Sequence, residues 1–245
     1  MRFLDHGEPD VFRNLALDDA LLYDAEEHGT GPLLRIWHQP TLAVVLGASG
    51  RIGADVDVDR CRADGVTIAR RSSGGGTVLI GPGVLQFAVV LPIASSPEYG
   101  AVDRAQKSVL GRCADSLNAL LERNVPRLEV LGSADLAIAG RKCSGSAQRR
   151  LRDWFLVHAS LLFDFPIELV SRYLKLPERR PAYRENRSHE EFLTNFQRSR
   201  EAITESLRSA WAAAAEPTSV PDRVSDRAKE IVQSKLSRPE WIDRL

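Results

Sequence analysis

Two arginines and three consecutive glycines form the part of this sequence best suited to hold an anion. Arg70 and Arg71 precede two serines and the glycines of Gly74–Gly76, within ARRSSGGGTVLIGPGVLQ (69–86). A backbone without Cβ atoms can approach a ligand closely, and its amides can converge on an anion. The arginine guanidinium is a rigid, always charged fork that suits carboxylate or phosphate. Taken alone, the stretch is also compatible with a flexible hairpin turn that carries surface arginines.

A second stretch offers another cation beside residues with little bulk. In GSADLAIAGRKCSGSAQRR (132–150), Asp135 precedes a short predicted strand, Gly140 makes a tight turn, and Lys142 begins the next strand. The residues that follow are small: Ser144, Gly145, Ser146 and Ala147. This pattern suggests an ammonium aimed into a cleft, although a single lysine most often lies on a solvated face. Together the two stretches offer three cations and a bare loop, which could neutralise an anionic substrate and a phosphate.

The surrounding elements must bring these two stretches together. The spacing of apolar residues predicts an amphipathic helix over 11–28 that ends before Gly29. Residues 33–37 and 42–46 read as short strands joined in a hairpin through His38–Thr41. The remaining predicted strands cover 66–69, 77–80, 84–91, 128–131, 136–139, 142–147 and 155–163.

Further helices are predicted at 57–64, 101–123, 167–174 and 222–236. Ser188–Glu191 reads as a capping box, in which hydroxyl and acid satisfy amides of the first turn, and it predicts a helix that runs to about Ala215.

Most predicted strands are separated by turns rather than by crossover helices. This arrangement favours an α/β fold of the α+β type, with a mixed, mainly antiparallel sheet flanked by helices, over a doubly wound parallel sheet. The glycine loop is neither GxxxxGK[ST] nor a GxGxxG that opens a helix, so it matches neither common nucleotide fingerprint. We expect residues 1–245 to form one domain.

Composition excludes several classes of protein. The chain has 245 residues, of which 43% are hydrophobic, and its 33 basic and 33 acidic residues leave no net charge. General nucleic-acid and membrane-surface binders usually carry a basic excess, so we expect neither partner. Cys61, Cys113 and Cys143 form no disulfide or zinc pattern and fit a reducing compartment. With no signal peptide and no long apolar run, the sequence predicts a cytoplasmic protein.

The two stretches together resemble the lipoate–protein ligase A family, within the biotin/lipoate A/B protein ligase superfamily. ARRSSGGG resembles the family's lipoate and ATP loop, and GRKCSGSAQR resembles the strand that carries its catalytic lysine. The resemblance covers nearly the whole chain, through segments such as NLALDDALL, WHQPTLAVVLG and VHASLLFD. It implies a catalytic domain like those of class II aminoacyl-tRNA synthetases and biotin ligases. The family's small C-terminal accessory domain is expected to be absent, so a separate chain could supply that part.

This resemblance also implies a chemistry and a set of site residues. Lipoate and ATP give lipoyl-AMP, whose acyl group passes to a lysine of a lipoyl-domain acceptor, such as a 2-oxoacid dehydrogenase E2 component or a glycine-cleavage H-type protein. Lys142 falls on the catalytic lysine. Magnesium accompanies such phosphates, and Asp135 is either its candidate ligand or an ordinary strand-end residue. The implied lipoate and ATP contacts are Arg70, Arg71, Ser73, Gly74, Gly75, Gly76, Thr77, Val78, Leu79, Lys142, Ser144, Gly145, Ser146 and Ala147.

The sequence departs from the family pattern just after the glycine loop. Many family members carry His-Asp where this chain has Ile80 and Gly81, and the Gly-Pro-Gly that follows Ile80 resembles the octanoyltransferase branch. Two alternatives to the ligase therefore stay open. One is ATP-independent octanoyl transfer from an acyl carrier protein, and the other is a non-catalytic protein that binds lipoyl domains. Some octanoyltransferases use a cysteine nucleophile, but Cys143 should point away from Lys142 on an alternating strand and is interpreted as a core residue.

Two further features have both a functional and an ordinary interpretation. His158 lies in a predicted strand and matches a family position near the site, yet a single histidine is more often structural. Four arginines form a basic loop that could contact the acidic face of a lipoyl domain or could simply be solvated; they are Arg179, Arg180, Arg184 and Arg187.

Overall fold

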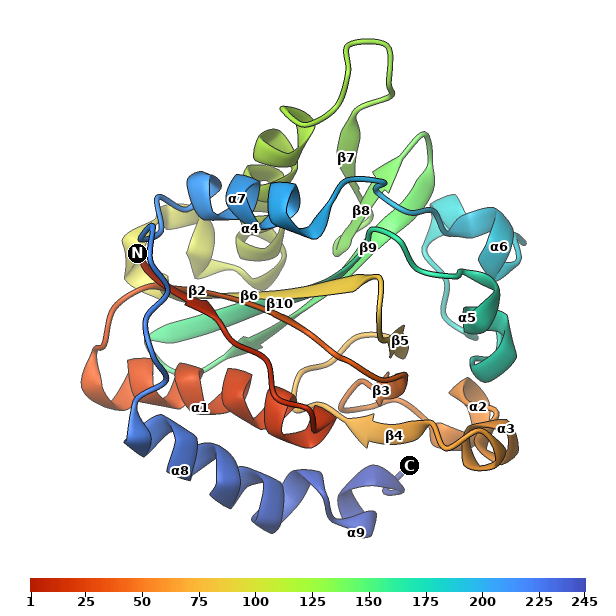
Figure 1. The fold of residues 1–245 in the computed structure, drawn as a ribbon, viewed down its shortest axis with the longest axis horizontal. Helices are drawn as coiled ribbons and strands as arrows, with labels where there is room; N and C mark the ends of the chain where they lie inside the picture. The colour runs from red at the N-terminus through yellow and green to blue at the C-terminus, as the bar shows by residue number, and fades with distance from the viewer.

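A seven-stranded sheet crosses the centre of the molecule (Figure 1). The computed structural model describes all of residues 1–245. The outer β1 (Arg2–Asp5) pairs with β2 in parallel, and every other neighbouring pair of this sheet is antiparallel. The predicted mixed, mainly antiparallel sheet is therefore confirmed. After β1, the order continues through β2 (Leu33–His38), β6 (Val84–Pro92), β10 (Trp154–Leu162), β9 (Arg141–Arg150), β8 (Asp135–Ile138) and β7 (Leu128–Leu131).

A separate three-stranded sheet lies beside it, in the order β4 (Thr67–Arg70), β3 (Ala43–Leu46) and β5 (Val78–Ile80). The expected hairpin between residues 33 and 46 is wrong, because β2 and β3 belong to different sheets. Gln39 explains the separation: its buried amide donates to the carbonyl oxygen of Pro9 and accepts from Asn14. The connection is thereby fixed to the start of α1 (Val11–His28) and cannot form a tight turn.

Helices cover both faces of the large sheet (Figure 1). On one face, α4 (Val102–Asn118) and α7 (Arg200–Ala210) close an apolar core with β6, β9 and β10. On the other face, α1 and α8 (Asp222–Ile231) enclose a second core that also includes side chains of the small sheet. A third core joins the outer side of the small sheet to the short helices α3 (Val58–Ala63), α5 (Glu168–Tyr173) and α6 (His189–Phe192).

The short elements complete the chain. They are the helices α2 (Ile52–Asp55) and α9 (Pro239–Ile242), the 3-10 turns at Ile93–Ser95, Pro97–Gly100 and Ala182–Arg184, and a π-helical turn at Val232–Leu236 that extends α8. None of the helices combines the length and the apolarity that crossing a bilayer requires.

The long helix expected from Ser188 to about Ala215 is broken in the structure. The capping box forms as predicted, but α6 stops after Phe192. The chain then runs extended, because the backbone amide of Thr194 donates to the carbonyl oxygen of Lys142 and that of Phe196 donates to Leu162. Burial of the Phe196 side chain in the α4-side core also stabilises this extended run.

We predict that Gly83→Ala destabilises the fold. Gly83 joins β5 to β6 with φ of 88°, and a Cβ there would overlap the carbonyl oxygen of Asp164. Such strain typically costs about 1–3 kcal/mol of unfolding free energy, measured by urea titration. Gly111→Ala in α4 is the control, because nothing lies within 4 Å of its Cβ position and alanine favours a helix. A Gly83→Ala variant as stable as the parent would contradict this account of the turn.

Candidate active site

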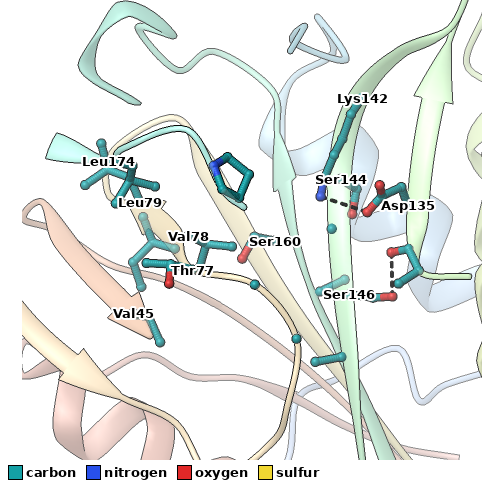
Figure 2. A pocket seen from close by; sticks show the side chains of 18 of the residues that line it. Val45, Thr77, Val78, Leu79, Asp135, Lys142, Ser144, Ser146, Ser160 and Leu174 are labelled. Atoms are coloured by element: carbon teal, nitrogen blue, oxygen red, sulfur yellow. Dashed lines mark hydrogen bonds and ion pairs between the residues drawn. The ribbon is translucent and has the colours of Figure 1, made fainter. Parts of the chain in front are cut away.

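The main cleft lies between the two sheets, on the α1 side of the large sheet, and has a volume of about 860 Å³. That volume is in the range of small-molecule and cofactor sites. One part of its wall is apolar, with Leu15, Trp37, Val45 and Ile80. Another part carries polar and charged groups that include Lys142 and Asp135 (Figure 2). The cleft can therefore accommodate a ligand that has both an apolar and an anionic portion.

Strand register determines which residues form the cleft floor. Trp37 on β2 pairs with Gln86 on β6, which faces Ser160 on β10, then Gly145 on β9 and Asp135 on β8. The hydroxyl of Ser160 donates to the Gln86 amide oxygen at 2.6 Å. The Gln86 Nε2 is buried without a protein partner, although it belongs to a residue of the cleft wall.

Arg71 holds the glycine loop in place. Its buried guanidinium donates to the carbonyl oxygens of Gly74 and Gly76, at 2.6 and 2.9 Å, and to that of Val45. Burial lowers the pKa of Arg71 to about 10, so the side chain remains charged near neutral pH. All of its partners are neutral, and no carboxylate pairs with it. Its positive charge is therefore uncompensated at the wall of the cleft.

Two glycines allow the loop to pack this closely. Gly75 has φ of 89°, a conformation that side chains disfavour, and a Cβ on Gly47 would overlap the carbonyl oxygen of Gly75. Gly76 differs from both, because no atom lies within 4 Å of its Cβ position. The loop thus rests against the end of β3 at Gly75, and it has open space at Gly74 and at Gly76, of which Gly76 lines the cleft.

Arg70, predicted as a ligand contact, lies outside the cleft lining. The side chain is fully buried and donates to the carbonyl oxygens of Gly47, Gly50 and Ile242. The indole of Trp241 donates in turn to the carbonyl oxygen of Arg70 at 2.9 Å. Arg70 thus connects the loop after β3 to the C-terminal helix α9, which supports the cleft from outside.

Both serines of the loop are anchored to α1, a connection that the sequence did not predict. Ser73 accepts from Arg71 Nε and bonds to His158 Nε2 at 2.6 Å, and His158 Nδ1 lies 3.3 Å from Asp18. Asp18 is paired with the fully buried Arg35 at 2.5 Å. Burial acts to raise the pKa of Asp18, but the charge of Arg35 and the hydrogen bond with His158 outweigh it, so the pKa is lowered overall.

Ser72 has an equivalent anchor. Its hydroxyl donates to Asp19 at 2.6 Å, and Asp19 also pairs with Arg149. Lys235, from the turn that extends α8, donates to the same hydroxyl at 2.9 Å. The adjacent Asp18 and Asp19 in an otherwise apolar stretch of α1 were the only sequence signal for these contacts, since acids on a buried helix face need partners.

Lys142 lies at the start of β9 and faces the loop across the cleft (Figure 2). Its ammonium is 2.7 Å from Asp135 Oδ1. It extends over Gly145, where a Cβ would lie only 2.7 Å from the Lys142 nitrogen. The small residue predicted behind the lysine therefore provides the space that this side-chain conformation requires.

Asp135 does not fit a preformed magnesium site. One carboxylate oxygen contacts Lys142, and the other accepts from the Tyr183 hydroxyl at 2.7 Å. No group of three or more His, Cys, Asp or Glu side chains is arranged to hold a metal ion. We therefore assign Asp135 to the ion pair with Lys142 and not to a metal site.

Most of the other predicted contacts do line the cleft. Thr77 is among them, and its hydroxyl donates to Asp55 at 2.7 Å. Ser73 and Gly74 are not lining residues, and both accept hydrogen bonds from Arg71. Ile80, in place of the family's histidine, is buried in the α1-side core. The predicted site residues that do line the cleft are Arg71, Gly75, Gly76, Thr77, Val78, Leu79, Asp135, Lys142, Ser144, Gly145, Ser146 and Ala147.

Cys143 has the orientation expected of a core residue. Its side chain is 0% exposed in the α4-side core, and burial raises the pKa of its thiol to about 12. Cys61 and Cys113 are equally buried. The chain therefore presents no accessible thiolate to the cleft.

The basic loop divides into two pairs. Arg184 and Arg187 are structural, because both guanidinium groups stack on the ring of Phe192. Arg179 and Arg180 are exposed at the rim of the cleft. The predicted contact surface for an acidic partner is thus reduced to these two side chains.

Comparison with known proteins connects this geometry to one family. Residues 10–216 match the family model of the lipoyl protein ligase A/B catalytic domain. A "Probable lipoate-protein ligase A" of Mycoplasma genitalium is 31% identical over 163 residues, which are 66% of this chain and 46% of that protein. An octanoyltransferase LipM of Kyrpidia tusciae is 27% identical over 270 residues and covers 98% of this chain and 97% of its own length. The chain thus spans less than half of the Mycoplasma protein and nearly all of the transferase.

Solved structures share the fold. A lipoate-protein ligase A bound with ATP superposes with a TM-score of 0.83 at 22% identity, over 100% of this chain and 99% of its own. A bi-partite lipoate protein ligase from Thermoplasma acidophilum, studied with its E2 lipoyl domain, gives a TM-score of 0.82 at 23% identity, over 99% and 95% of the two chains.

Asp18→Asn tests the buried connection behind the loop. Losing the charge leaves Arg35 buried without a counterion, and we expect a loss of about 3–5 kcal/mol of unfolding free energy at pH 7. Folding lowers the pKa of Asp18. The contribution of Asp18 to the free energy of unfolding is therefore present above the pKa of the unfolded state, about 3.9, and is lost as the pH falls through the lower pKa of the folded state. The difference between parent and variant, measured by urea titration, should therefore shrink below about pH 4.

The matched control is Asp59→Asn, at the exposed pair of Asp59 with Arg62, where a change below about 1 kcal/mol is expected. A folded Asp18→Asn variant with parental stability at pH 7 would show that the buried pair does not have this role.

Proposed function

The chain belongs to the lipoyl protein ligase A/B catalytic domain family, and from this premise we propose that it is an ATP-dependent lipoate–protein ligase. Two cations at one cleft carry the proposal. Arg71 brings an uncompensated charge beneath the glycine loop, and Lys142 brings an ammonium from the opposite wall. Activation of a carboxylate by ATP places two anionic groups side by side, and fixed positive charge is what that encounter requires.

In the proposed reaction, a carboxylate oxygen of lipoate forms a bond to the α-phosphorus of ATP, and the bond from that phosphorus to the bridging oxygen breaks. Pyrophosphate leaves with the electron pair. Lys142 would stabilise the charge that develops between carboxylate and phosphate. The neutral amine of an acceptor lysine then attacks the carbonyl carbon of lipoyl-AMP, AMP leaves, and the new amide nitrogen loses a proton.

The apolar wall supports an acyl chain as the other half of the ligand. Leu15, Trp37 and Val78 would contact hydrocarbon, while the glycine backbone remains free to approach the nucleotide. The solved relatives, bound with ATP in one case and studied with an E2 lipoyl domain in the other, agree with ATP as substrate and a lipoyl domain as acceptor. Arg179 and Arg180 at the rim would meet the acceptor, and a separate accessory chain would complete the ligase as in a bi-partite enzyme.

A second candidate is ATP-independent octanoyl transfer. It is favoured by the match to LipM over nearly the whole chain and by the Gly81-Pro82-Gly83 turn. A transferase that forms a thioester needs a reactive cysteine, and the three thiols of this chain are all buried. This contrast favours the ligase.

One assay separates the two. The acceptor lipoyl domain is weighed by mass spectrometry after incubation with enzyme, lipoate and ATP, and again after incubation with octanoyl-carrier protein without ATP. A lipoyl mass gain that requires ATP supports the ligase, and an octanoyl gain without ATP supports the transferase. No gain in either arm would indicate a protein that binds without turnover.

Gly76→Val is predicted to fold normally and to lose ATP binding. Open space surrounds the Cβ position of Gly76 at the cleft wall, so the new side chain would occupy room that the nucleotide needs without striking protein atoms. Calorimetric titration with ATP should show at least a tenfold weaker affinity, equal to about 1.4 kcal/mol. Unchanged affinity in the folded variant would place the nucleotide elsewhere.

Lys142→Ala is predicted to slow activation strongly while the fold is kept, because the side chain is partly exposed and contributes little to the core. Loss of one preorganised charge contact typically costs about 3–4 kcal/mol of transition-state stabilisation, or roughly 100- to 1000-fold in rate. Lys142→Arg should also fail, because a planar fork cannot replace a point charge above Gly145. Single-turnover formation of acyl-AMP measures both variants, with circular dichroism as the folding control. A near-parental rate in folded Lys142→Ala would remove this lysine from the mechanism.

A further inference from the structure

Asp135 lies between the candidate catalytic lysine and a tyrosine from a distant part of the chain. One carboxylate oxygen is 2.7 Å from the Lys142 ammonium, and the other accepts from the Tyr183 hydroxyl at 2.7 Å. Tyr183 lies in the 3-10 turn Ala182–Arg184, outside both stretches that define the active site. We infer that Tyr183 is a positioning residue, which acts on Lys142 through Asp135; this inference rests on the proposed ligase function.

The hydroxyl of Tyr183 is held in a fixed position. Its ring packs against Phe192 with centroids 5.2 Å apart. Arg187 donates to the carbonyl oxygen of Tyr183 and, at 3.0 Å, to that of Gly140. The same guanidinium therefore ties the tyrosine to the turn that precedes Lys142. Tyr183 and Lys142 therefore belong to one set of connected contacts, although they lie far apart in the sequence.

A second set of contacts fixes the lysine strand to the same region. Arg141 donates to the carbonyl oxygen of Leu193 at 2.5 Å, and Lys142 forms a backbone bridge to Leu193. The segment from Tyr183 to Leu193 thus contacts the start of β9 twice, through the Arg141 side chain and through the Lys142 backbone. The position of the ammonium depends on this segment.

The hydrogen bond from Tyr183 determines which carboxylate oxygen of Asp135 contacts the Lys142 ammonium. An ammonium has three donors, and a carboxylate with one oxygen already engaged contacts it through the other oxygen alone. Two donors of Lys142 are then free to point into the cleft. Burial, followed by the charge of Asp135, raises the pKa of Tyr183, which keeps the hydroxyl protonated as a donor. Without that hydroxyl, the second oxygen is free to turn toward Lys142 and to draw the ammonium away from the ligand.

Tyr183→Phe removes only the hydroxyl, and Tyr173→Phe is its matched control. The Tyr173 hydroxyl also donates to an aspartate, Asp64 at 2.9 Å, but neither residue lines the cleft. In single-turnover formation of acyl-AMP, Tyr183→Phe should lower the maximal rate by about ten- to a hundredfold through misplacement of the ammonium, with KM values for lipoate and ATP within about twofold, as expected when only transition-state contacts are lost. Tyr173→Phe should leave both quantities unchanged.

A second measurement needs no turnover. Reaction of Lys142 with an amine-directed acylating reagent, followed by peptide mass mapping, reports how its ammonium is held in the free protein. In Tyr183→Phe both carboxylate oxygens of Asp135 should contact the amine and shield it from the reagent, so labelling of Lys142 should slow. In Asp135→Asn, labelling should accelerate.

The double variant tests whether the tyrosine acts through the aspartate. If it does, adding Tyr183→Phe to Asp135→Asn should change the labelling rate no further, which is the coupling that a double-mutant cycle isolates. Parental labelling in Tyr183→Phe, or equal effects of this substitution with and without Asp135, would overturn the inference. If the parent protein forms no acyl-AMP, the proposed ligase function fails, but the labelling result still decides the role of Tyr183.

Discussion

A line of buried polar contacts from Arg35 to the glycine loop is the constraint on which the cleft depends. Arg35 neutralises Asp18, Asp18 faces His158, His158 bonds to Ser73, and Ser73 supports Arg71. Each link lies in a different element, so α1, β2, β10 and the loop must all be in place before Arg71 can hold the glycines. Buried ion pairs contribute little net stability because desolvation offsets their attraction. We interpret the Arg35–Asp18 pair as a device that selects one conformation of the loop.

The two cations of the cleft are held in different ways, and the difference suits the reaction proposed for them. Arg71 is immobilised among carbonyl oxygens, so it supplies a constant positive field at the wall. Lys142 is a point charge at the end of a flexible side chain, and it is positioned by a single carboxylate above a residue that lacks a Cβ. A cation buried among carbonyl oxygens suits binding of phosphate in the ground state, whereas a point charge held by Asp135 suits the charge that develops between carboxylate and phosphate.

Relatives of this chain include both ligases and transferases. From the sequence alone, the glycine turn after β5 suggested the transferase branch, whereas the structure shows that all three cysteines are buried. Gly83 in that turn is required for packing against Asp164, which gives the Gly-Pro-Gly a structural role that is independent of the reaction. The turn is therefore weaker evidence on function than the buried cysteines, because only an exposed thiolate can form a thioester.

The sequence by itself determined the elements with strong local signals and the two motifs of the cleft. Periodicity, turns and strand alternation within a few residues were enough to predict helix 11–28 and the strands around the glycines. The same signals predicted that Cys143 points into the core and that Lys142 lies at the start of a strand. Tertiary structure alone decided where β3 pairs, why the helix after Ser188 stops, and that Arg70 lies behind the cleft instead of in it. Those outcomes depend on partners far along the chain, such as Pro9 for Gln39, Leu162 for Phe196 and Ile242 for Arg70. The sequence did not predict the contacts of Asp18 and Tyr183 for the same reason. Folding places Asp18 beside Arg35 and Tyr183 beside Asp135, and both partners are distant in the sequence.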